Sequence, residues 1–152
     1  MPEVHWTQYL AALSTPTVAI FGSIIAYRQW RTAQNKLKLD LFEKRFAVYN
    51  AARSALSTIT TSGKITNEES YKFLSGTREA KWLLDETISE YFDKVLWERI
   101  CYLQMLQAEL EGLPVGDDRN KNIEQQSNVK DWIREQHPVL DAKFASYLRI
   151  GH

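Results

Sequence analysis

The chain has 152 residues, 44% of them hydrophobic, and its 19 basic and 19 acidic side chains balance to a formal net charge of zero. This length suits one modest domain, and the balanced charge excludes the strong overall positive field that non-specific nucleic-acid binding needs. The single cysteine, Cys101, excludes an internal disulfide. It lies in an apolar helical stretch, so we expect it to be a small buried hydrophobe.

The N-terminal region is strongly apolar, with 22 uncharged residues from Trp6 to Tyr27. A helix of that length measures about 33 Å, enough to cross a hydrocarbon core of roughly 30 Å. The leading interpretation is a transmembrane helix at residues 6–27, within a membrane segment at 1–30 that precedes a helical domain at 31–152. The polar stretch Ser14-Thr15-Pro16-Thr17 interrupts the run. An interfacial or re-entrant segment and a helix packed in a soluble core therefore stay open as alternatives.

Basic residues follow the apolar run and set the expected orientation. They are Arg28, Arg31, Lys36, Lys38, Lys44 and Arg45, opposed only by Asp40 and Glu43. Lys and Arg beside a transmembrane segment stay in the cytoplasm. The prediction is a membrane protein with its N-terminus outside and its bulk in the cytoplasm.

The remaining chain reads as helices separated by turns. No Pro or Gly interrupts residues 28–62, and apolar residues recur there at helical spacing. Gly63 is expected to cap this long helix at its C-terminus. Thr66 and Glu69 form a capping-box pattern that opens a short helix to about Leu74, and Gly76 is expected to break it.

Helical spacing resumes near Arg78, pauses near Asp85 and continues to Gly112. A polar loop is predicted at 115–122, followed by a last helical region that Pro138 interrupts or kinks. No alternating pattern of strand length is present. The predicted fold class is all-α, an N-terminal transmembrane helix continuing into an antiparallel bundle of three or four helices.

No catalytic motif is found in the sequence. The three histidines are far apart, and there is no HExxH, no CxxC and no glycine-rich phosphate loop. Acidic residues such as Glu86 and Glu90 lie beside Lys94 and Arg99, which is typical of a solvated mixed-charge face. We therefore predict a protein that is not an enzyme and has no cofactor or metal.

Small residues recur at three- and four-residue spacing in the apolar segment: Ala19, Gly22, Ser23 and Ala26. In lipid, such residues let helix backbones approach closely, so this face predicts a homo-oligomer, although it could also pack on its own chain or face lipid. The hydroxyls of Ser14, Thr15 and Thr17 would favour partners or a wet lumen inside a bilayer. Together these seven residues are the expected oligomer or pore helix.

Arg31, Lys38 and Arg45 recur every seven residues, with Phe42 and Tyr49 on the same strip. Basic side chains interleaved with aromatic rings can hold phosphates and stack bases. This basic ladder is one candidate site for a nucleotide or single-stranded oligonucleotide. The alternative is that the basic residues contact anionic lipid headgroups while the rings belong to the core.

The stretch Gln29-Trp30-Arg31-Thr32 followed by Lys36–Tyr49 (KLKLDLFEKRFAVY) resembles a family of small bacterial proteins. In that family a membrane segment precedes a YxQWRT…KLxLDLFxxRFxVY signature. Thr77–Ala80 and Phe144–Leu148 are also similar to it, with Ser146 where the family has proline. The family is mostly of unknown function, so the resemblance implies an architecture, and a location in the bacterial inner membrane, more than an activity. The layout is also similar to the membrane effectors of Hailong anti-phage systems, which would imply an oligomeric channel controlled by a nucleic-acid-like ligand from a partner encoded nearby.

The leading functional hypothesis is an oligomeric membrane effector that forms a gated channel or pore. One alternative is a single-pass adaptor that presents a helical interaction surface without ion flux. Another is a soluble binding module whose apolar N-terminus docks on its own bundle.

Overall fold

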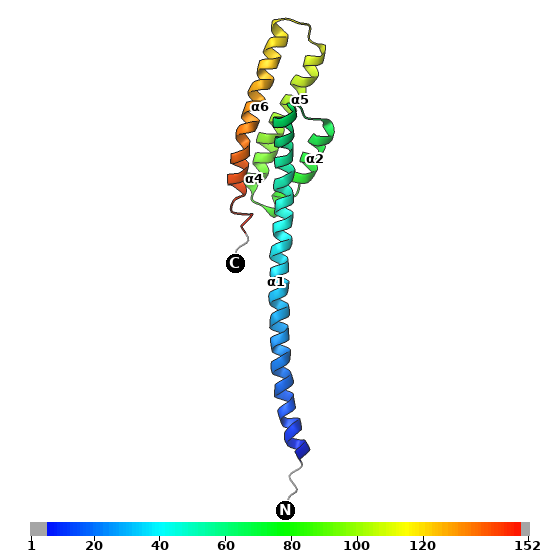
Figure 1. The fold of residues 1–152 in the computed structure, drawn as a ribbon, viewed down its shortest axis with the longest axis vertical. Coiled ribbons are helices and arrows are strands. Elements are labelled where there is room, and N and C mark those ends of the chain that lie inside the picture. The colour runs from blue at the N-terminus through cyan, green and yellow to red at the C-terminus, as the bar shows by residue number, and fades with distance from the viewer. Residues whose placement is uncertain (1–5, 150–152) are drawn as a thin grey trace, which may run out of the picture. The chain divides into compact units, whose positions relative to one another are not determined.

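The computed structural model describes the backbone of residues 6–149 and the side chains of residues 18–149. These residues form helices joined by short turns, and within 6–149 none lies in a β-strand (Figure 1). The predicted all-α class is confirmed. The chain divides into two compact units, Met1–Asp40 and Leu41–His152. The boundary between these two compact units follows Asp40, and the division at residue 30 stays a prediction.

The first unit contains the N-terminal part of helix α1, which runs from Trp6 to Ser62. Every residue from Val18 to Asp40 is exposed. Over the part of the chain that is described, no helix is both long enough and apolar enough to cross a bilayer. Beyond the Ser14–Thr17 polar stretch, the uncharged run from Val18 reaches only Tyr27, about 15 Å of helix, before Arg28. The predicted transmembrane helix at residues 6–27 is thus not supported.

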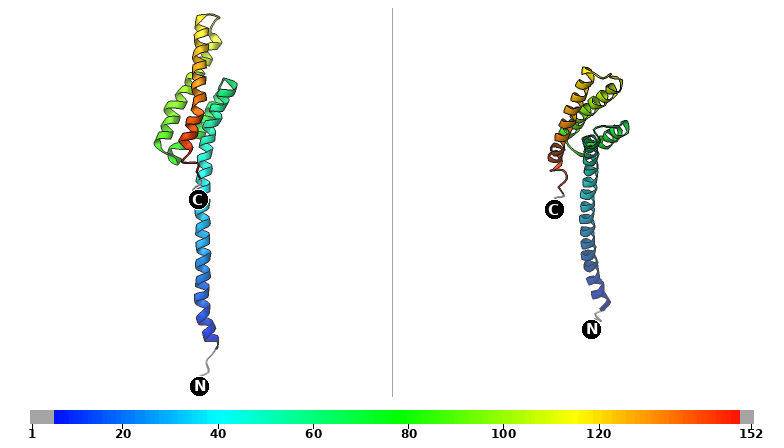
Figure 2. Two further views of the ribbon diagram at one scale, coloured as in Figure 1. Left: turned by 60° about the vertical axis from the view of Figure 1, so that its left-hand side comes forward. Right: turned by 45° about the horizontal axis from the view of Figure 1, so that its top comes forward.

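The second unit is a helical bundle. It contains the end of α1 and the elements α2 (Asn67–Thr77), α3 (Ala80–Leu83), α4 (Glu86–Glu90), η1 (Tyr91–Leu96), α5 (Trp97–Gly112) and α6 (Asp117–Phe144). The end of α1, α5 and α6 lie side by side, and the short α2 lies beside α1 and α5 (Figures 1 and 2). The element η1 is a π-helix, and its wider turn places Tyr91, Phe92 and Leu96 in the core together.

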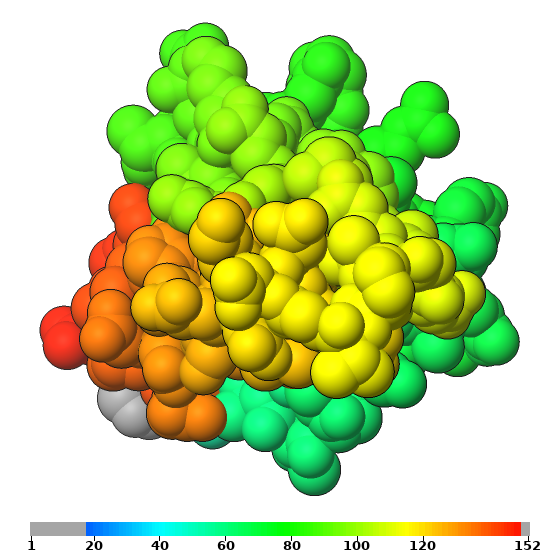
Figure 3. All heavy atoms as spheres, turned by 90° about the horizontal axis from the view of Figure 1, so that it is seen from above, coloured from blue at the N-terminus to red at the C-terminus, as the bar shows by residue number. Residues whose placement is uncertain are grey.

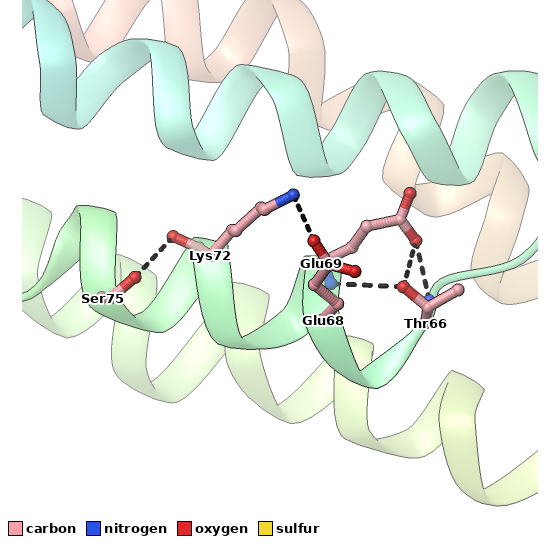
Figure 4. Close-up of polar contacts among 5 residues, drawn as sticks. All are labelled: Thr66, Glu68, Glu69, Lys72 and Ser75. Atoms are coloured by element: carbon pink, nitrogen blue, oxygen red, sulfur yellow. Dashed lines mark hydrogen bonds and ion pairs between the residues drawn. The ribbon is translucent and has the colours of Figure 1, made fainter.

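Local capping chemistry ends α1 and begins α2 and α4 where the sequence predicts. Gly63 has φ +70° and donates its backbone N–H to the Ile59 carbonyl at 2.9 Å, which closes α1. Thr66 and Glu69 form the predicted capping box at the start of α2, drawn in Figure 4. Asp85 accepts from the Ile88 N–H at 3.0 Å and caps α4.

Two expectations about helix boundaries are wrong, and a third is wrong in part. Helix α2 continues through Gly76 to Thr77, because the missing side chain of Gly76 lets α2 approach Ala51 of α1 closely. Helix α6 begins at Asp117, so most of the predicted 115–122 loop is helix. The carboxylates of Asp117 and Asp118 in its first turn interact favourably with the positive end of the helix dipole, which stabilises this start of the helix. Helix α6 also continues through Pro138, between the fully buried residues Ile133 and Leu140, so Pro138 does not interrupt it, while a kink at Pro138 stays a prediction.

A row of aromatic rings crosses the core of the bundle, whose other members are mostly aliphatic. Tyr49 of α1 contacts Phe144 of α6 with ring centroids 5.4 Å apart, Phe144 contacts Phe92 at 6.0 Å, and Phe92 contacts Phe73 of α2 at 6.1 Å. Such pairs add about 0.5–1.5 kcal/mol each beyond their burial. Cys101 lies outside this core and is exposed, so the expectation that it is buried is wrong. Its helix position faces solvent between Ile100 and Leu103, which are buried.

One end of the bundle is closed by the connection between α5 and α6, shown in yellow in Figure 3. The Arg119 guanidinium donates to the carbonyls of Leu110 at 3.2 Å and Leu113 at 2.9 Å. These two carbonyls belong to the end of α5, where helical partners are missing. Arg119 therefore fastens the start of α6 to the end of α5.

Candidate functional site

The first unit presents two opposed faces on one exposed helix. The apolar arc consists of Val18, Ile20, Phe21, Ile24, Ile25 and Tyr27, and each of these side chains is 47–70% exposed. The small-residue face consists of Ala19, Gly22, Ser23 and Ala26. At about 100° of rotation per residue the two sets fall largely on opposite sides of the helix. Water therefore meets an apolar surface that no other described part of the chain covers.

The small-residue face is compatible with close packing against another helix. A Cβ atom added to Gly22 would meet nothing within 4 Å. The Ser23 hydroxyl donates to the Ala19 carbonyl at 2.8 Å, so its polar group is satisfied inside its own helix. Ser14, Thr15 and Thr17, the other predicted members of this helix, lie outside the residues whose side chains are described.

Aromatic and basic residues follow the apolar arc. The rings of Tyr27 and Trp30 have centroids 6.1 Å apart. Arg28, Arg31 and Lys38 are exposed, and no ion pair within the described part of the chain involves them. This order of apolar, aromatic and cationic side chains matches the order of hydrocarbon, interface and headgroups in a membrane.

The basic ladder does not form a single exposed strip. Arg31 and Lys38 are exposed in the first unit, whereas Arg45 is half-buried in the second. The Arg45 Nε donates to the Leu83 carbonyl at 3.1 Å, and its guanidinium lies 5.5 Å from the centre of the Tyr147 ring. Arg45 therefore has structural partners.

The two aromatic members of the ladder belong to the bundle. Phe42 is half-buried and stacks on Phe46. Tyr49 is buried, and its hydroxyl donates to Asp141 Oδ1 at 2.6 Å while accepting from Arg53. Burial, and then the hydrogen bond to Asp141, raise the pKa of Tyr49. The Tyr49 ring is thus packed between helices rather than available for stacking on a base.

A groove of about 320 Å³ lies between α1 and α2, lined by Ala51, Ser54, Ala55, Thr58, Glu69, Lys72 and Phe73. Its charged groups already have partners. Glu69 bonds Thr66 in the capping box, and Lys72 Nζ lies 2.7 Å from Glu68 Oε1 (Figure 4). We therefore expect little affinity for a charged ligand here.

A second hollow, of about 290 Å³, lies between α5 and α6. Its lining residues are Arg99, Tyr102, Gln125, Asn128, Val129 and Trp132. The Arg99 guanidinium lies 5.2 Å from the centre of the Trp132 ring. Sequence reasoning placed Arg99 on a solvated face and missed this hollow. In the sequence, helical spacing groups the lining residues of α5 with one another, and likewise those of α6. It does not reveal that these two helices meet at this hollow.

No residue arrangement in the described chain offers evident catalytic chemistry. Among the described residues no group of three His, Cys, Asp or Glu side chains could hold a metal ion. His137 Nε2 lies 3.4 Å from the Thr60 hydroxyl, a contact between α6 and α1. That the protein is not an enzyme and has no cofactor stays a prediction. The exposed apolar arc and the two hollows are features that suit binding.

Comparison with known proteins found no matching family model, no matching curated protein and no matching solved structure.

Proposed function

We propose that this chain is a membrane-attached, self-associating effector that permeabilises a bilayer when its N-terminal helices assemble. The observation that carries the proposal is the apolar arc, which is exposed over its whole length and opposes a small-residue face. The bundle of the second unit would receive the controlling signal. The order of an N-terminal membrane segment and a helical domain resembles that of channel-forming anti-phage effectors, and this resemblance also supports a role in permeabilising membranes.

The energetics favour a lipid partner for the apolar arc. Full burial of one large apolar side chain contributes roughly 1.5–3 kcal/mol. Six partly exposed side chains together contribute on the order of 5–10 kcal/mol, comparable to the insertion of an acyl chain. The arc has no charged member, and the cations begin only at Arg28. The proposal therefore places the arc in the acyl region and the cations at the headgroups.

Self-association would use the opposite face. Inside a bilayer, helices pair through close packing of small residues. Gly22 and Ala26, and likewise Ala19 and Ser23, are four residues apart and so stack along one side of the helix. With the large side chains turned toward lipid, the small face is left for a second copy of the chain.

Attachment is tested by flotation of the full chain with vesicles containing anionic lipid. Ile24→Glu puts a charge in the apolar arc and should release most of the protein, since a carboxylate is costly in hydrocarbon. Tyr71→Glu is the matched control, because Tyr71 is 70% exposed on α2 in the bundle. Equal flotation of both variants would contradict membrane attachment through the arc.

Self-association and pore formation are tested by the double variant Ala19→Leu and Gly22→Leu. It should remain on vesicles but lose its oligomeric mass and its release of trapped ions. The chain's own packing does not explain such a loss, because the space beside Gly22 is open. Val18→Leu with Ile25→Leu, a similar change in the apolar arc, is the control. Full ion release by the small-face variant would overturn the pore proposal.

An adaptor without ion flux is the second candidate, and exposed aromatic residues on the bundle favour it. Trp82 is 78% exposed beside Lys81, whose Nζ lies 4.6 Å from the centre of the Trp82 ring. An exposed Trp with a cation is typical of a protein-binding hot spot. The adaptor predicts vesicle binding with no ion release under any condition, and loss of partner capture in Trp82→Ala.

A further inference from the structure

The hollow between α5 and α6 combines an exposed arginine that lies over a Trp ring with amide groups that have no hydrogen-bond partner among the described residues. Arg99 and Tyr102 come from α5, and Gln125, Asn128, Val129 and Trp132 come from α6. Its volume of about 290 Å³ is close to the lower limit for pockets that hold small ligands. No carboxylate is among its lining residues. The hollow therefore favours anions.

Arg99 differs from four of the other arginines of the bundle. Arg45, Arg53, Arg119 and Arg134 each donate a hydrogen bond to a protein oxygen. The Arg99 guanidinium instead lies 5.2 Å from the centre of the Trp132 ring, and it bonds no acceptor in the described chain. Stacking on an indole restricts the guanidinium plane, so less entropy is lost when the group binds a carboxylate or phosphate.

The rest of the hollow provides an apolar base and hydrogen-bonding edges. Val129 is 4% exposed, and Tyr102 and Trp132 are half-buried, so the base and the rings are held by the core. The amides of Gln125 and Asn128 are exposed, about one helical turn apart, and have no hydrogen-bond partner within residues 18–149. Amide groups can both donate to and accept from a polar ring edge.

We propose that this hollow binds a small anion whose phosphate or carboxylate is joined to a planar ring. The anionic group bonds Arg99, the ring lies on Val129 and Tyr102, and the two amides bond the polar edge of the ring. This site does not depend on the membrane attachment proposed above, and vesicle binding by the protein neither supports nor excludes it.

The test is a titration of the full chain followed by the NMR signal of the Trp132 indole N–H, assigned with Trp132→Phe. The probes are phenyl phosphate, benzoate, adenosine 5′-monophosphate, adenosine and inorganic phosphate. At least one ring-bearing anion should saturate with a Kd below about 1 mM. Adenosine lacks the charge and inorganic phosphate lacks the ring, so each should bind at least about tenfold more weakly. If phenyl phosphate binds more tightly than benzoate, the site prefers a phosphate, and the opposite order means that it prefers a carboxylate.

Variants assign the binding to named residues. Arg99→Gln should raise the Kd about tenfold or more, because it removes the charge-assisted hydrogen bonds. Arg99→Lys keeps the charge and should recover part of the affinity. Arg78→Gln is the control for net charge, since Arg78 is exposed and does not line the hollow. Gln125→Ala should weaken adenosine 5′-monophosphate more than phenyl phosphate, whose ring has no polar edge.

Three results would overturn the proposal. The first is no saturable shift by any ring-bearing anion up to about 10 mM. The second is equal affinity for inorganic phosphate, which would mean an adventitious ion only. The third is binding that Arg99→Gln leaves unchanged while the variant's circular dichroism shows a folded protein.

Discussion

Gly76 is a point where two helices of the bundle approach very closely, and its substitution by alanine is expected to destabilise the protein. The Cβ of an alanine at 76 would lie 2.5 Å from the Cβ of Ala51. Carbon atoms in contact are normally about 3.5–4.0 Å apart. Ala51 carries no flexible chain that could rotate away, so α1 and α2 themselves must separate.

The magnitude follows from two opposing terms. Alanine in place of glycine inside a helix is favourable by about 0.5–1 kcal/mol. Overpacking of a tight contact costs about 1–3 kcal/mol. The net expectation for Gly76→Ala is a loss of about 1–2 kcal/mol in the free energy of unfolding. A Cβ added to Gly112, the last residue of α5, would meet nothing within 4 Å, so Gly112→Ala should have no cost or a gain of up to about 1 kcal/mol.

Urea unfolding of the full chain, followed by circular dichroism, measures both variants. A second test is the pair Ala51→Gly with Gly76→Ala, which removes the clash. The coupling in the double-mutant cycle should be favourable by about 1–2 kcal/mol. If Gly76→Ala is as stable as the parent chain, or if Ala51→Gly does not rescue it, the close approach of α1 and α2 is incorrect.

Two further predictions concern titratable groups of the bundle. Burial raises the pKa of Tyr91 from 10.0 to about 12, so the folded state holds the phenol proton where the unfolded state has lost it. The contribution of Tyr91 to the free energy of unfolding is complete below pH 10 and falls by about 2 kcal/mol as pH rises toward 12. In urea unfolding measured against pH, Tyr91→Phe should reduce this dependence on pH. The variant should also lose the hydrogen bond from Tyr91 to Gln136 (3.0 Å). Hydrogen bonds from Thr87 and then Tyr147 lower the pKa of Asp85 from 3.8, so its contribution to stability is present above that pH and is lost below it. Asp85→Ala should cost about 1 kcal/mol at neutral pH by removing the cap of α4, whereas Asp85→Asn should keep the cap and weaken the acid dependence; equal acid dependence in Asp85→Asn and the parent would contradict this role.

The parts of the fold that could be predicted from sequence depend on atoms a few residues apart. The C-cap at Gly63, the box of Thr66 with Glu69, and the cap at Asp85 each join groups within four residues. Their geometry is set by the local backbone, so residue type and spacing are sufficient. The same holds for the all-α class, which follows from helical periodicity.

The parts that could not be predicted depend on which helices meet. Gly76 has the sequence appearance of a helix breaker and becomes a contact point only because α2 lies against Ala51. Arg45 and Tyr49 match a ligand-binding pattern, yet Leu83 and Asp141, both distant in sequence, engage them. The hollow at Arg99 was missed for the same reason, since its two halves come from separate helices.

The distribution of burial separates folding from the proposed membrane function. All buried hydrophobic residues of the described chain lie from Val48 onward, and residues 18–40 contribute none. The apolar side chains of residues 18–27 therefore do not stabilise the fold, and their substitution should change the free energy of unfolding of the bundle by less than about 0.5 kcal/mol. Exposed apolar surface is unfavourable in water unless something outside the chain covers it. A variant such as Ile24→Glu that loses vesicle binding while unfolding at the same urea concentration would show that this surface serves association and not folding.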